Sequence, residues 1–98
     1  MMIFVGDTYN FILPVFGTAG ANPSVTVTPV ITVIEVASGN ALTIDTVNNH
    51  TYATMVLITG TKKVYKFAWT VPSGADGDYV AICSYTADGV TYTDRYVD

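Results

Sequence analysis

Charged side chains are scarce in this chain: only 12% of its 98 residues are Asp, Glu, Lys or Arg, against roughly 25% in an average domain. Only four of them are basic, and the formal net charge is -4. Four cations cannot form the basic stripe that nucleic-acid backbones require, so we expect no nucleic-acid partner. With so little charge, either uncharged polar groups, chiefly threonine, keep the surface soluble, or a partner covers part of it.

Cysteine and histidine are nearly absent, with one residue of each, Cys83 and His50. A single cysteine allows no intrachain disulfide, which is compatible with folding in a reducing compartment. Cys83 lies in the middle of an expected strand, where a small buried side chain is its usual role, and His50 lies in an asparagine-rich turn. Because the sequence offers no nucleophile with a base beside it, we expect no catalytic residues, no enzymatic activity and no cofactor.

A calcium site would need Asp76, Asp78 and Asp88 to gather at one end of the molecule. Asp-Gly turns account for these aspartates without a metal, and the dense D-x-D-x-D-G run of a calcium loop is missing. We therefore expect no metal site. No apolar run approaches the length of a membrane span, and residues 1–5 are too short for a signal-peptide core, so we expect synthesis in the cytoplasm and no membrane partner.

What the sequence does contain is alternation with a period of two. Tyr65, Phe67 and Trp69 fall on one face of an expected strand, and such an aromatic stripe is more often core than an exposed platform. Residues 78–85 are apolar on both faces, which indicates a central strand. Residues 87–89 favour a hairpin turn into a returning strand.

The first two thirds of the chain predict further strands, divided by two prolines. Pro14 should lie on an edge strand or at a bulge, and Pro29 should bend or bulge the longest strand. Before Pro29, we expect Val25 and Val27 to face inward. The strands expected here are residues 3–5, 9–16, 24–36, 42–45 and 55–59. With no helical periodicity anywhere, the chain predicts one all-β domain over residues 1–98, an antiparallel sandwich of seven to eight strands.

One segment after Pro29 stands out because neither of its faces is polar. Residues 30–36 read VITVIEV, and such a run predicts either a second layer of structure or a partner. We expect this run and the apolar N-terminal segment to form an interface in which strand edges pair with another chain. The interface residues that we expect are Ile3, Phe4, Val30, Ile34 and Val36.

The phrase ADGDYVAIC, residues 75–83, resembles the D-x-G-x-Y-x-C corner of immunoglobulin-like domains, in which the tyrosine hydroxyl bonds back to the backbone. Asp76 stands three residues before Tyr79 instead of four, Ala81 replaces the family cysteine, and Trp69 lies just before the corner instead of on an early strand. The phrase is similar to disulfide-free relatives in bacterial surface proteins and bacteriophage virion proteins, where a hairpin like DGVTYT recurs after it. The resemblance implies an immunoglobulin-like β-sandwich.

The resemblance, the sparse charge and the missing export signal together predict a non-enzymatic structural protein. We expect a small bacteriophage virion component, a capsid decoration or a tail adaptor, located in the virion and partnered by other virion proteins and by copies of itself. The alternative is a module that binds glycans or surface polymers. For that alternative, Tyr92 and Tyr96 are the residues we expect to be exposed for stacking on a sugar.

Overall fold

The computed structural model describes residues 2–16, 18, 23–60, 63–72, 74 and 77–97, without the side chains of Met2 and Ile3. Within these residues the secondary structure is all β, as the alternation predicts, and no helix is present. The strands are β1 (Met2–Ile3), β2 (Thr8–Pro14), β3 (Val25–Glu35), β4 (Tyr52–Thr54), β5 (Val56–Leu57), β6 (Val64–Thr70), β7 (Gly77–Ala87) and β8 (Val90–Tyr96).

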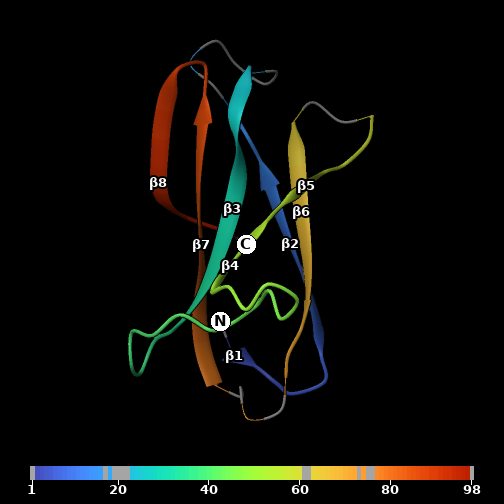
Figure 1. Cartoon of the computed structure of the whole chain (residues 1–98), viewed down its shortest axis with the longest axis vertical. Helices are drawn as coiled ribbons and strands as arrows, with labels where there is room; N and C mark the ends of the chain where they lie inside the picture. The colour runs from blue at the N-terminus through green and yellow to red at the C-terminus, as the bar shows by residue number, and fades with distance from the viewer. Residues whose placement is uncertain are drawn as a thin grey trace.

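The strands form two antiparallel sheets. The larger sheet has the order β1-β7-β3-β4, with β8 also paired to β7, and the smaller sheet has the order β2-β6-β5. β1 pairs with the first two residues of β7, and β8 pairs with its second half. Figure 1 shows the two sheets facing each other, with β2 and β6 opposite β3, β7 and β8. The predicted antiparallel sandwich is confirmed, and β7 is its central strand.

The core lies between the sheets and is built from every second residue of the strands. The aromatic stripe of β6 belongs to it, since Tyr65 is buried, Trp69 is only 5% exposed and Phe67 is half-buried against the core. This placement confirms the prediction that the stripe is core. The other strand residues of the hydrophobic core cluster are Phe11 and Leu13 of β2, Ile31 and Val33 of β3, Ala53 of β4, and Tyr79, Ala81, Cys83, Tyr85 and Ala87 of β7.

Pro14 and Pro29, the two prolines expected in strands, lie where proline is tolerated. Pro14 lies on β2, an edge strand of the smaller sheet, and Pro29 lies at an irregularity, because the register of β3 against β7 shifts between Val27 and Val30. A second shift lies between Val25 and Val27. The prediction that Val27 faces inward is wrong: its side chain is exposed, because these shifts interrupt the alternation on which the prediction depended.

The middle of the chain also departs from the expected strands. Residues 42–45 are not a strand: Ala41 and Asp45 form isolated bridges with Ile34 and His50 respectively, and Ile44 packs in the core. Where one strand was expected over residues 55–59, the chain instead forms the short strands β4 and β5, which belong to different sheets. Met55 between them is buried, so this is the point where the chain crosses from one sheet to the other.

The turn between β7 and β8 is a two-residue hairpin, as predicted. Asp88 and Gly89 have φ values of 51° and 76°, the left-handed conformation that a tight hairpin requires at both positions. The Ser24 amide donates to Asp88 Oδ1 at 2.9 Å, and the Asp88 amide donates to the Ser24 carbonyl oxygen at 2.9 Å. These bonds tie the hairpin to the start of β3.

Candidate functional site

The first candidate site is a surface on the side of the larger sheet that faces away from the core. Directly opposed residues of antiparallel strands place their side chains on the same face. The register aligns Tyr52 of β4 with Thr32 of β3, Thr32 with Ile82 of β7, and Ile82 with Tyr96 of β8. One row of side chains therefore crosses four strands.

Two neighbouring rows extend this surface. Val30 lies opposite Ser84, and Ile34 lies opposite Val80. The four aliphatic side chains, Val30, Ile34, Val80 and Ile82, are half-buried. We call this surface the outer face and define it by Val30, Thr32, Ile34, Tyr52, Val80, Ile82, Ser84 and Tyr96. None of its residues is charged.

The structure brings most of the predicted interface residues to the outer face or to one end of it. Val30 and Ile34 belong to the outer face itself. Val36, 53% exposed, follows β3 directly, and its amide donates to the Asp78 carbonyl oxygen near the start of β7 at 3.0 Å. Phe4, 57% exposed, follows β1, which pairs with the same part of β7. The side chain of Ile3 lies outside the described residues.

The two tyrosines predicted to stack on a sugar do not share a face. Tyr96 is 79% exposed and lies opposite Ile82 on the outer face. Tyr92 lies opposite the buried Tyr85, with ring centroids 5.1 Å apart, and is half-buried, so its expected exposure is wrong. The reason is a bulge: between the pairs Cys83–Arg95 and Tyr85–Tyr92 the register shifts, which reverses the alternation along β8.

A second candidate site is an open hollow beside β6 that sequence reasoning did not predict. Its volume is about 520 Å³. We call it the hollow; its lining residues are Ile44, Asp45, Thr46, Val47, Asn48, Ala53, Thr54, Phe67 and Ala68. It exists because β5 pairs only with Tyr65 and Lys66 of β6. Among the described residues, no strand covers this edge of β6 beyond Lys66.

The polar wall of the hollow is a tight turn over residues 45–50. Asp45 Oδ1 accepts a hydrogen bond from the Asn48 amide at 3.2 Å, and Oδ2 accepts one from Asn48 Nδ2 at 2.9 Å. These bonds, the side-chain one above all, hold the pKa of Asp45 below its usual value. His50 Nδ1 lies 4.0 Å from Asp45 Oδ2, and the His50 ring stacks on Tyr52 with centroids 4.6 Å apart.

The cysteine considered for catalysis is buried, and two of the aspartates considered for calcium binding lie far apart. Cys83 is buried, and burial raises the pKa of its thiol to about 11. Asp78 and Asp88 lie at opposite ends of β7, which spans about 33 Å at 3.3 Å per residue, so these two cannot share one cation. Asp76 lies outside the described residues. In the part of the chain that the structure describes, no group of three or more His, Cys, Asp or Glu is placed to hold a metal ion.

No helix long and apolar enough to cross a bilayer occurs among the described residues. Comparisons of the chain with protein-family models, with curated proteins and with solved structures find no match.

Proposed function

We propose that this protein is a non-enzymatic structural component of a bacteriophage virion, either a capsid decoration or a tail adaptor, that assembles through its outer face. The observation that carries the proposal is the width of this face: uncharged residues occupy a row that crosses four strands. Partners on this proposal are a second copy of the chain and other virion proteins, and the protein resides in the virion.

We also propose that the sandwich is immunoglobulin-like. If β2 to β8 are taken as strands B, C, C′, D, E, F and G, the two sheets have the orders B-E-D and C′-C-F-G, which fits that fold. Tyr79 supports the proposal, because it is buried near the start of the strand equivalent to F. Its hydroxyl donates to the side-chain oxygen Glu35 Oε2 at 3.2 Å, which departs from the backbone acceptor that the resemblance implies. β1 departs from the pattern, since it pairs antiparallel with β7.

The distribution of charge supports assembly between like-charged copies. Each chain carries a formal charge of -4, so two copies repel each other wherever their carboxylates approach. The eight residues that define the outer face are uncharged, and the nearest carboxylates, Asp94 beside Ser84 and Asp78 near the start of β7, are exposed at its margins, where solvent screens them. Association would then be stabilised by about 25 cal/mol for each Å² of apolar surface removed from water, chiefly on the side chains of Val30, Ile34, Val80 and Ile82.

Light scattering coupled to size exclusion, over a series of protein concentrations, tests this proposal. We expect the wild-type chain to have an oligomeric mass that Ile34→Asp reduces to that of a monomer, because the variant places a carboxylate among the aliphatic side chains of the outer face, opposite Val80. The matched control is Ile12→Asp. Ile12 is also exposed, but it lies on the smaller sheet, opposite Lys66, so this variant should keep the oligomeric mass.

The folded state of each variant is checked through the fluorescence of Trp69, the one tryptophan of the chain, which is buried in the native core. A monomeric wild-type chain at every concentration would contradict self-assembly and leave the outer face to a different virion protein. Loss of the oligomer in Ile12→Asp but not in Ile34→Asp would place the interface on the smaller sheet and overturn the proposal for the outer face.

A further inference from the structure

We propose that the hollow binds one pyranose ring of a neutral saccharide, with a face of the sugar on Phe67 and its hydroxyl groups on the turn over residues 45–48. This inference goes beyond the assembly role and does not depend on it. The volume of about 520 Å³ falls within the range of small-molecule sites in proteins, roughly 300–1,000 Å³.

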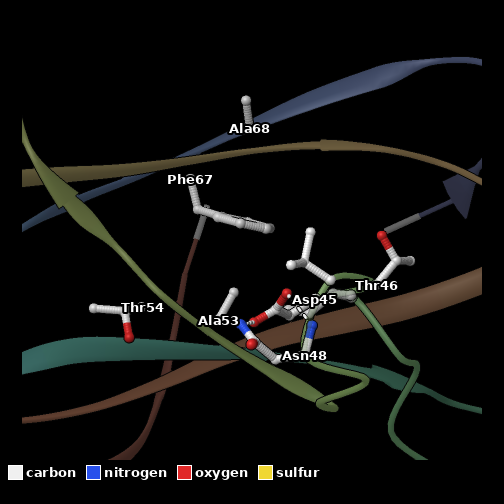
Figure 2. Close-up of a pocket in the computed structure, with 9 residues that line it drawn as sticks. Asp45, Thr46, Asn48, Ala53, Thr54, Phe67 and Ala68 are labelled. Carbon is white, nitrogen blue, oxygen red and sulfur yellow. Dashed lines mark hydrogen bonds between the residues drawn. The ribbon is translucent and has the colours of Figure 1, made fainter.

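The apolar wall of the hollow includes an aromatic ring that the core covers only in part. Phe67 belongs to the same stripe as Tyr65 and Trp69, yet it is half-buried where both of those are buried. Figure 2 shows its ring between the β6 ribbon and the turn that carries Asp45 and Asn48. The C–H groups of one pyranose face pack on such a ring, because the face of an aromatic ring is the negative part of its quadrupole.

The polar wall offers both donors and acceptors, which is what sugar hydroxyl groups need. The Thr46 hydroxyl donates and accepts, and the Asn48 side-chain oxygen accepts. Each Asp45 oxygen takes one hydrogen bond from Asn48, and a carboxylate has about four lone-pair positions in all, so acceptor capacity is left over. Because the turn holds these groups in place without a ligand, little ordering is needed on binding.

The backbone of β6 adds a further pair of groups. The Val64 carbonyl oxygen accepts a hydrogen bond from the Ile58 amide, so the backbone groups of Val64 point to the edge of β6 that faces β5. Along a strand, the N–H and C=O groups of successive residues point alternately to its two edges. Ala68 is four residues further on, so its N–H and C=O point to that same side. No strand pairs with β6 at that position within the described chain, and Ala68 lines the hollow. A ligand that both donates and accepts would satisfy these groups.

Charge and donor geometry select a neutral ligand. Among the described residues, Asp45 is the one charged residue that lines the hollow, and no Lys, Arg or His of that part of the chain lines it, so an anionic ligand would meet repulsion there without compensation. An ammonium ion only donates hydrogen bonds, so it would leave the N–H of Ala68 without an acceptor. A hydroxyl-rich neutral ring matches the donors and the acceptors together.

Two-dimensional ¹H–¹⁵N NMR of the full chain tests the proposal. The probes are the methyl glycopyranosides of glucose, galactose, mannose and N-acetylglucosamine, each titrated to about 50 mM, since one sugar ring supports a dissociation constant on the order of 1 mM. At least one probe should give saturating shifts of the backbone amides of Asp45, Thr46, Asn48 and Ala68. Sorbitol, which has the hydroxyl groups but no ring, should not.

Two pairs of matched variants separate binding from general effects on the fold. Phe67→Leu and Asn48→Ala should each weaken binding about five-fold, from the lost aromatic face and the lost hydrogen bonds. Their controls, Phe16→Leu and Asn40→Ala, make the same changes at exposed positions outside the hollow and should leave the dissociation constant unchanged. The absence of saturating shifts with all four glycosides, equal shifts with sorbitol, or equal effects of variants and controls would each overturn the proposal. The mass measurements on Ile34→Asp are independent of all three outcomes.

Discussion

The two isoleucines of β3 test which face of this strand is core. Ile31 is 0% exposed between the sheets, and Ile34 is half-buried on the outer face, opposite Val80. They lie three residues apart and carry the same side chain, so replacement of each by alanine removes the same three carbon atoms. Any difference between the two variants therefore comes from the surroundings of each side chain.

The expected losses follow from burial. Three buried carbons are worth about 2.4 kcal/mol of transfer free energy, and the cavity that Ile31→Ala leaves in a closed core adds to this, for a total of about 3.5 kcal/mol. Ile34→Ala loses about half of the transfer term and leaves no closed cavity, so its cost is about 1 kcal/mol. For a domain of this size the melting temperature should fall by about 20 °C and by about 6 °C respectively.

Urea unfolding followed by the fluorescence of Trp69 measures both values, provided that the dependence on urea concentration is the same in each variant. The measurement is made at a protein concentration where the chain is monomeric. Equal losses, or a larger loss for Ile34→Ala, would refute the assignment of the two faces. If the outer face is an interface, the cost of Ile34→Ala should also grow with protein concentration, since assembly stabilises the folded wild-type chain by mass action.

Three further predictions concern one hydrogen bond, one turn glycine and the buried thiol. A double-mutant cycle on Tyr79→Phe and Glu35→Ala should give a coupling energy of about 1–2 kcal/mol, because the hydroxyl donates to the carboxylate; a coupling near zero would show that this bond adds nothing. Gly89→Ala should cost about 1–2 kcal/mol through its φ of +76° alone, since an added Cβ meets no atom within 4 Å; an unchanged urea midpoint would contradict the left-handed turn. Burial raises the pKa of Cys83 in the folded state from 9.0 to about 11. Between these values the unfolded chain loses the thiol proton and the folded chain keeps it, so the free energy of unfolding is retained below pH 9 and falls as the pH rises towards 11. A difference in this free energy between the wild type and Cys83→Ala that stays constant from pH 8 to pH 11 would exclude that linkage.

The strand faces that the sequence predicts are those where the alternation is uninterrupted. In β2, β6 and β7, each pair of neighbouring residues points to opposite faces, so the positions of Phe11, Trp69 and Tyr79 in the core follow from local pattern alone. The hairpin at Asp88 and Gly89 is local too, because its geometry depends on two residues that tolerate a positive φ.

The wrong predictions of side-chain direction both lie beside a bulge. One extra residue reverses the parity of everything that follows it, and this explains the exposure of Val27 and the separation of Tyr92 from Tyr96. The hollow could not be predicted for a different reason. It depends on the point at which the chain crosses from β4 of the larger sheet to β5 of the smaller sheet, which is a long-range property that no local pattern encodes. The Asn48-Asn49 turn signal predicts the turn but not its position against Phe67.

The apolar residues of the outer face call for an explanation other than the folding of the sheet. Thr32 and Ser84 occupy central positions on that face, so the sheet itself tolerates small polar side chains there. Threonine also supplies the β-branched preference for strands that valine and isoleucine have. Strand formation alone therefore gives no reason for aliphatic side chains at Ile34, Val80 and Ile82. A partner that removes these half-buried side chains from water gives such a reason, because burial of apolar surface is favourable. The aliphatic residues of the outer face, in a chain with so few charges, therefore support the proposal that a partner covers this face in the assembled state.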